Sequence, residues 1–155
     1  MSRSRKGRTD SKIRQAHVDL RQDLLIVASY SKTVAGFWVM NGWFRTLSAS
    51  SNNSLLGDAV LDALDRSASD VPTPPREARP DAPILAALGI KTTRKYEQGT
   101  KSVGVKSAAG EIEIKPTENR GRDGFVEISD IVLQVPGRDP DHVGRVVREG
   151  LEQAR

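Results

Sequence analysis

The stretch that decides the fold runs from Glu111 to Leu151 and reads EIEIKPTENRGRDGFVEISDIVLQVPGRDPDHVGRVVREGL. Charged and apolar residues alternate over 111–115, which predicts a half-buried strand. Pro116 should close that strand, because proline has no N–H to donate to a ladder. The apolar run 131–135 predicts a second strand, covered on both faces. We expect the polar segment between them, with Gly121-Arg122-Asp123-Gly124, to turn the chain.

A helix should end this stretch. Asp139 can cap it and Pro140 suits its first position, where no backbone donor is needed. Apolar residues at helical spacing mark the buried face: Val143, Val146, Val147 and Leu151. Two oppositely charged pairs four residues apart should lie on the solvent side: Arg145 with Glu149, and Arg148 with Glu152.

A second helix is predicted from Ser54 to about Arg66, and its pattern matches that of the last helix at a constant offset. The match includes Gly57 and Gly144, which an amphipathic pattern does not demand. Glycine inside a helix costs about 1 kcal/mol relative to alanine. Its recurrence therefore predicts close packing of both helices.

In the N-terminal third of the chain, the sequence predicts strands and one short helix. Residues 10–22 show a helical spacing of apolar side chains, and Leu24–Ala28 is an apolar run typical of a buried strand. Asn41-Gly42 lies between two apolar segments, 36–40 and 43–47. That dipeptide is the strongest short-range signal for a β-hairpin, so we expect its turn there.

The middle of the chain begins with a proline-rich loop, 67–83, which holds five of the eight prolines. A short helix should follow at Ile84–Leu88 and end at Gly89. Residues 91–97 and 101–107 both favour strands, and Ala108-Ala109-Gly110 should turn the second into the strand that starts at Glu111.

Charge is divided unevenly along the 155 residues. Residues 1–22 carry seven basic and two acidic side chains, whereas residues 23–155 carry 17 and 18. We therefore divide the chain into a flexible basic tail, 1–22, and one near-neutral domain, 23–155. The fold class expected for that domain is α+β, with a largely antiparallel sheet and two main amphipathic helices packed on it.

Composition excludes several classes of protein. There is no cysteine, so disulfides and thiolate metal sites are excluded. No apolar run approaches the length of a membrane span, and the N-terminus lacks the apolar core of a secretory signal. We expect a cytoplasmic protein without cofactor, metal or catalytic residues.

The order of the segments resembles the immunity-protein family of contact-dependent growth inhibition systems, over roughly Ser54 to Ala154. The pieces that carry the resemblance are Leu55–Leu61, Lys91-Thr92-Thr93-Arg94, Ile112–Thr117, Gly121–Gly124, Ile131–Val135 and Val143–Leu151. The resemblance implies a protein that binds a cognate toxin domain, a nuclease from a neighbouring cell, and neutralises it by stoichiometric occlusion. A large toxin gene immediately upstream would favour this interpretation.

Two other functions stay open. The basic tail is compatible with a nucleic-acid-binding protein, although no aromatic residue is interleaved with its charges. Pro80-Asp81 followed by Glu113-Ile114-Lys115 resembles the motif of metal-dependent nucleases, in which two carboxylates hold the ion and lysine polarises the phosphate. Any charged amphipathic strand also produces Glu-x-Lys, so this third function is the least favoured.

If a toxin is the partner, segment 91–101 is the predicted contact surface. It places positive charge around one aromatic residue, and arginine and tyrosine are frequent anchors of protein interfaces. The partner-binding residues predicted are Arg94, Tyr96 and Lys101. The alternative is a solvated edge strand whose charges prevent aggregation.

Overall fold

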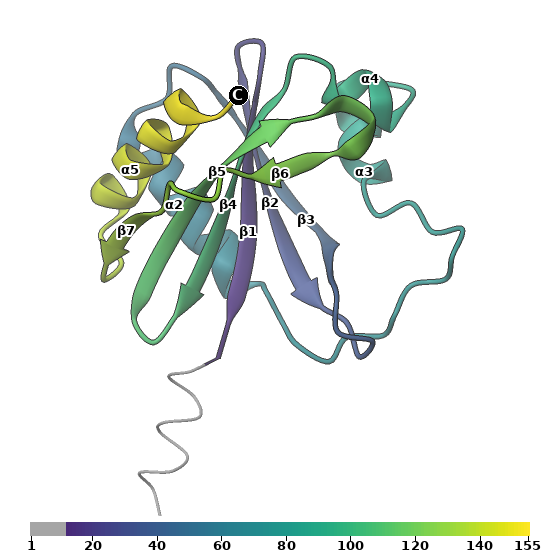
Figure 1. Ribbon diagram of the computed structural model, residues 1–155, viewed down its shortest axis with the longest axis horizontal. Helices are drawn as coiled ribbons and strands as arrows, with labels where there is room; N and C mark the ends of the chain where they lie inside the picture. Colours follow the sequence, from purple (N-terminus) through teal and green to yellow (C-terminus); the bar gives the residue numbers. More distant parts are fainter. Residues whose placement is uncertain (1–11) are drawn as a thin grey trace, which may run out of the picture.

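The computed structural model describes residues 12–155, which form an antiparallel sheet with helices on both faces (Figure 1). Of the expected flexible tail, 1–22, residues 1–11 lie outside the described residues, whereas residues 14–21 form a strand of the sheet. The elements are β1 (Arg14–Arg21), β2 (Leu24–Lys32), β3 (Trp38–Ser48), α2 (Asn53–Asp65), α3 (Ala82–Leu88), α4 (Thr93–Glu97), β4 (Lys101–Ala108), β5 (Glu111–Asn119), the 3-10 turn η1 (Gly121–Asp123), β6 (Phe125–Glu127), β7 (Leu133–Pro136) and α5 (Pro140–Gln153). The α+β class and its antiparallel sheet are confirmed.

The strands lie in the order β3-β2-β1-β4-β5, and β6 and β7 share the remaining edge of β5. β7 pairs with residues 111–114 of β5, and β6 pairs with residues 117–119. Neighbours in sequence are joined by tight turns, as in β4–β5, where the predicted turn at 108–110 is confirmed.

The main core lies between one sheet face and the two long helices, α2 and α5. Side chains alternate across the sheet, so Leu25 and Val27 of β2 enter this core, whereas Ile26 and Ala28 point to the opposite face. Each fully buried valine or leucine side chain stabilises the fold by roughly 1.5–3 kcal/mol. The predicted buried face of α5 is confirmed.

Gly57 and Gly144 let the two long helices touch backbone to backbone. A Cβ on Gly57 would lie 1.8 Å from the Pro140 carbonyl oxygen, and one on Gly144 would lie 1.9 Å from that of Asn53. Each glycine thus receives the first residue of the other helix. The predicted close packing at both glycines is confirmed.

The opposite face of the sheet carries the short helices α3 and α4 and a smaller core. Ile84 and Leu85 of α3 and Tyr96 of α4 pack over Ile26 and Ala28. The proline-rich loop precedes α3, and Gly89 ends that helix in the left-handed conformation, φ +68°, as predicted.

The prediction of a short helix within residues 10–22 is wrong, because residues 14–21 form β1, which lies between β2 and β4. Ala16 and Val18 enter the main core, while His17 and Asp19 point to the other face. Ala16, Val18 and Leu20 alternate with polar residues, as in a half-buried strand, but the spacing of Ile13, Ala16 and Leu20 also fits a helix.

The prediction of a hairpin turn at Asn41-Gly42 is also wrong, because β3 continues through this dipeptide without a reversal of the chain. The chain reverses earlier, where the Thr33 N–H donates to the Phe37 carbonyl at 2.8 Å. Gly42 has φ +97° and lies at an irregularity in the β2–β3 register, so the dipeptide makes a bulge. The Asn41 amide donates to Ser29, Ser31 and the Arg66 carbonyl, which ties the end of α2 to the sheet.

Residues 91–97 were expected to form a strand, but Thr93–Glu97 is the helix α4. The Thr92 hydroxyl accepts from the Lys95 N–H at 3.1 Å, so a β-branched residue that favours strands acts here as a helix cap. The helix exposes Arg94 and Lys95 and buries Tyr96.

Pro116 does not close β5, which continues to Asn119. The Pro116 carbonyl accepts from Ile128 at the gap between β6 and β7, where no ladder donor is required. The strand expected at 131–135 is shorter and lies at an edge. β7 covers Leu133–Pro136, and Val132 keeps 44% of its surface exposed.

Arg148 does not pair with Glu152 on the solvent side of α5. Its guanidinium donates to the Asn53 side chain at 2.9 Å and to the carbonyls of Ala49 and Ser51. It thereby fixes the loop that leads into α2. Across residues 12–155, neither Arg145 nor Arg148 forms an ion pair.

Candidate functional site

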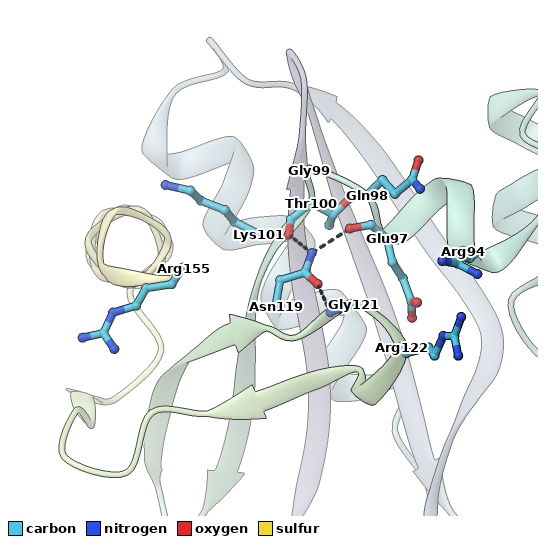
Figure 2. Close-up of a pocket in the computed structure, with 10 residues that line it drawn as sticks. All are labelled: Arg94, Glu97, Gln98, Gly99, Thr100, Lys101, Asn119, Gly121, Arg122 and Arg155. Atoms are coloured by element: carbon cyan, nitrogen blue, oxygen red, sulfur yellow. Dashed lines mark hydrogen bonds between the residues drawn. The ribbon is translucent and has the colours of Figure 1, made fainter.

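A basic cavity of about 510 Å³ opens at the end of the sheet near α4 and η1 (Figure 2). Its walls come from the last turn of α4, the segment leading into β4, the end of β5, η1 and the C-terminal residue. We call it the basic cavity. Its cationic lining residues are Arg94, Lys101, Arg122 and Arg155.

Asn119 holds the walls of the basic cavity together (Figure 2). Its amide donates to the carbonyls of Glu97 at 2.6 Å and Thr100 at 2.8 Å, and its side-chain oxygen accepts from the Gly121 N–H at 2.9 Å. One side chain of β5 therefore links α4, the approach to β4 and η1. This network fixes the backbone segments that carry the lining residues of the cavity.

The C-terminal residue is fixed by the same strand. The Arg155 N–H donates to the Thr117 carbonyl at 3.0 Å, and the Arg155 carbonyl accepts from the Asn119 N–H at 2.8 Å. These bonds extend the β5 ladder beyond the end of its pairing with β4. Arg155 is thereby held beside the cavity.

The four cationic side chains of the basic cavity are exposed to solvent. Within residues 12–155 none of them takes part in an ion pair. Glu97 is the acidic residue of the lining, and burial first, then Asp81 and Asp19, raise its pKa. The cavity therefore has a net positive charge that an acidic partner group could neutralise.

Two of the three residues predicted to bind a partner lie on this cavity. Arg94 on α4 and Lys101 at the start of β4 are both exposed, Arg94 on the side of Arg122 and Lys101 on the side of Arg155 (Figure 2). Tyr96 is placed differently: it retains 7% exposure, and its hydroxyl donates to Asp19 at 2.6 Å. Tyr96 thus anchors α4 to the sheet.

The sequence interpretation missed three residues of the cavity. Arg122 was assigned only to a turn, while Asn119 and Arg155 were given no function. The polar residues around the turn carried a usable signal, because Asn119, Arg120 and Arg122 lie close together a few residues after the predicted strand 111–115. Nothing local in the sequence shows that α4 lies opposite this turn.

The carboxylates of the nuclease-like motif have other partners. The Asp81 carboxylate accepts from the Thr93 hydroxyl at 2.5 Å, and Glu113 lies 3.9 Å from the Lys115 ammonium. In the part of the chain that the structure describes, no three histidine or acidic side chains are grouped as metal ligands. None of the helices within residues 12–155 combines the length and apolar character needed to span a membrane.

Comparison with solved structures shows the same fold in two bacterial proteins. One is a protein of unknown function from Neisseria meningitidis, with TM-score 0.80 and 20% identity, covering 94% of this chain and 98% of that one. The other is a chain of a CdiA-CT/CdiI toxin and immunity complex from Yersinia pseudotuberculosis, with TM-score 0.74 and 20% identity, covering 93% and 98%. A search among curated proteins finds no match.

The family comparison agrees with the segment order noted in the sequence. The model of the CDI immunity proteins, CdiI, matches residues 14–154, from the first strand to the residue after the last helix. This match includes the sheet, both long helices and the residues of the basic cavity except Arg155. The chain therefore belongs to the CDI immunity protein family.

Proposed function

We propose that this protein neutralises the toxin domain of a contact-dependent growth inhibition system by binding it one to one through the basic cavity. The observation that carries the proposal is the set of exposed cations held around one concave surface in a member of an immunity family. The fold-related Yersinia pseudotuberculosis chain comes from a toxin and immunity complex, which supports a toxin domain as partner.

The cavity suits an acidic surface of that toxin. Arginine presents a planar fork of donors that matches a carboxylate, and charge-assisted hydrogen bonds are stronger than neutral ones. Nucleases that use divalent metal ions carry clustered carboxylates. A nuclease toxin would therefore offer the charge that the basic cavity complements, and occupation of its carboxylates would block the metal and the substrate.

The mechanism requires occlusion and no turnover. Desolvated charge pairs at the centre of an interface slow dissociation, whereas charges at its rim mainly speed association. Arg94 and Lys101 would serve both purposes, because the backbone of each is fixed by a regular element and each lines the open cavity with an exposed charge. Tyr96 contributes indirectly, by holding α4 against the sheet.

Replacing Arg94 and Lys101 together by alanine tests this proposal. We expect the affinity for the cognate toxin domain to fall at least thirtyfold, which corresponds to about 2 kcal/mol, the size of an interface hot spot. The matched control replaces by alanine two exposed arginines that do not line the basic cavity, Arg76 and Arg145.

The control removes the same charge from places away from the basic cavity, so a general electrostatic effect would weaken both double variants alike. Calorimetry measures the two affinities, and far-UV circular dichroism checks that both variants keep their fold. Equal affinity in the cavity variant and the wild type would place the toxin contact elsewhere.

A further inference from the structure

A second cavity lies on the other side of Glu97, between the sheet and the helices α3 and α4. It has a volume of about 220 Å³ and is lined by both aromatic and acidic side chains. We call it the acidic cavity. Its polar lining residues include His17, Asp19, Tyr30, Asp81, Tyr96 and Glu97.

The carboxylates of the acidic cavity are only partly satisfied. Asp19 accepts from the Tyr96 hydroxyl, and Asp81 accepts from the Thr93 hydroxyl. A carboxylate offers about four acceptor positions, so each retains capacity for further donors. No lysine or arginine lines this cavity among residues 12–155. Its charge is therefore opposite in sign to that of the basic cavity.

His17 provides an independent indication of a ligand. His17 is half-buried and lines the acidic cavity. Its ring centroid lies 4.4 Å from that of Tyr30, with the two ring planes tilted by 37°, and among residues 12–155 the ring has no hydrogen-bond partner. No buried side-chain nitrogen or oxygen within residues 12–155 lacks a partner. The unpartnered ring nitrogens are therefore accessible to solvent, and because His17 lines the acidic cavity they are available to a group bound there.

The protonation of the lining favours a donor as ligand. Burial lowers the pKa of His17, although Asp19 and Glu127 act in the opposite direction, so the neutral ring can accept a hydrogen bond. Burial also raises the pKa of Asp19, which hydrogen bonds from Ser102 and Tyr96 and the nearby His17 only partly oppose. A bound cation would reduce the free-energy cost of burying the ionised Asp19 carboxylate.

We propose that the acidic cavity binds a single alkylguanidinium or alkylammonium group, held by Asp19, Asp81 and His17 against the rings of Tyr30 and Tyr96. Such a group supplies several N–H donors and a positive charge, and aromatic faces attract cations. Pockets for drug-sized ligands measure about 300–1,000 Å³. The volume of this one, about 220 Å³, fits the end of a side chain or a small organic cation.

The probe for this site is ethylguanidinium, with uncharged ethylurea as its matched control. Both are titrated at constant ionic strength into the full-length ¹⁵N-labelled protein, and amide shifts are followed by NMR. We expect saturable shifts around Asp19, Tyr96 and Ser102 with ethylguanidinium alone, and a Kd of about 1 mM, as suits a ligand of this size.

Asp81→Asn keeps the size of the side chain and its acceptor for Thr93 while removing one charge from the cavity. We expect it to raise the Kd for ethylguanidinium at least fivefold. Asp58→Asn removes the same charge from the exposed side of α2, on the opposite face of the sheet, and should leave the Kd unchanged. Linear shifts, an equal response to ethylurea, or an unchanged Kd in Asp81→Asn would overturn the proposal.

A second measurement assigns the source of the cation. If a basic side chain of the toxin enters the cavity, ethylguanidinium competes with the toxin domain and Asp81→Asn weakens its binding. If a free small cation is the ligand, neither change alters toxin affinity. The cation site does not depend on the toxin contact proposed above, because the first titration contains no toxin.

Discussion

The crossing of α2 and α5 at Gly57 and Gly144 makes a strong prediction about stability. A methyl group at position 57 would lie 1.8 Å from the Pro140 carbonyl oxygen, whereas ordinary contacts begin near 3.4 Å. The obstacle is backbone, so a side-chain rotation cannot relieve it. The two helices would have to separate by about 1.6 Å at this point.

The expected net effect of Gly57→Ala is a loss of about 3 kcal/mol in the free energy of unfolding. Alanine gains roughly 1 kcal/mol in helix propensity, but a radial gap of even 0.5–1 Å forfeits about a quarter to a half of the dispersion energy of the atoms it separates. The separation would extend to core residues on both helices, and overpacking adds a strain of about 1–3 kcal/mol.

A graded series of variants provides the controls. At Gly150 the new methyl group would meet the Ile114 side chain at 2.9 Å, which can shift, so Gly150→Ala should cost about 1 kcal/mol. At Gly104 the nearest atoms lie 4.0 Å away, so Gly104→Ala should stay within about 0.5 kcal/mol of wild type. Gly57→Ala and Gly144→Ala combined should cost less than their sum, because one separation relieves both contacts.

Urea unfolding followed by circular dichroism measures these differences in the free energy of unfolding. In thermal unfolding, the Tm of Gly57→Ala should fall by roughly 6–12 °C. A Gly57→Ala variant that is as stable as wild type, or more stable by its gain in helix propensity, would refute the close approach of the helices.

Three further changes test other parts of the fold. Arg148→Ala should lower the free energy of unfolding by about 2 kcal/mol in urea titrations, because three hydrogen bonds that fix the loop before α2 are lost; an unchanged value would show that the loop does not need them. Asn41→Ala should cost about 1–2 kcal/mol by thermal unfolding, since its amide ties β3 to β2 and α2; wild-type Tm would contradict this. The folded-state pKa of His17 lies below its ordinary value of 6.5, so the unfolded state binds more protons and His17 costs stability as the pH falls below about 6.5. His17→Gln should therefore lose less stability than wild type between pH 6.5 and 5; parallel profiles would argue against a desolvated His17.

Regular amphipathic segments were predictable from the sequence because their patterns reflect burial directly. The buried faces of α2 and α5 follow from apolar spacing, and the paired glycines predicted close packing at each helix, although not that the two helices pack on each other. The β4–β5 hairpin was equally clear, since Val103 and Val105 alternate with smaller or polar residues before a glycine turn.

The errors arose where tertiary context selects between two local patterns. Residues 14–21 form a central strand in which apolar residues alternate with His17 and Asp19, whose face lines a polar cavity; the spacing of Ile13, Ala16 and Leu20 fits a helix equally well. Asn41-Gly42 has the composition of a turn, but its left-handed glycine is used in a bulge. Thr92 favours a strand by propensity and caps a helix by its hydroxyl.

The basic cavity was only half predictable for a similar reason. Arg94 and Lys101 lie in one charged segment, which the sequence shows. Their neighbours Arg122 and Arg155 arrive from distant positions, brought there by η1 and by the pairing of the last residue with β5. Tyr96 is buried by packing against residues of the sheet and α3, and its hydroxyl contacts Asp19; no local pattern indicates either contact.

The most direct test of the central claim is an activity titration with the cognate toxin domain. The purified toxin is held at a concentration well above the Kd, increasing amounts of this protein are added, and the remaining toxin activity is measured. Neutralisation by occlusion predicts a linear fall to zero at one equivalent, with calorimetry giving the same stoichiometry. Full activity at excess immunity protein, or complete inactivation by a small fraction of an equivalent, would contradict it.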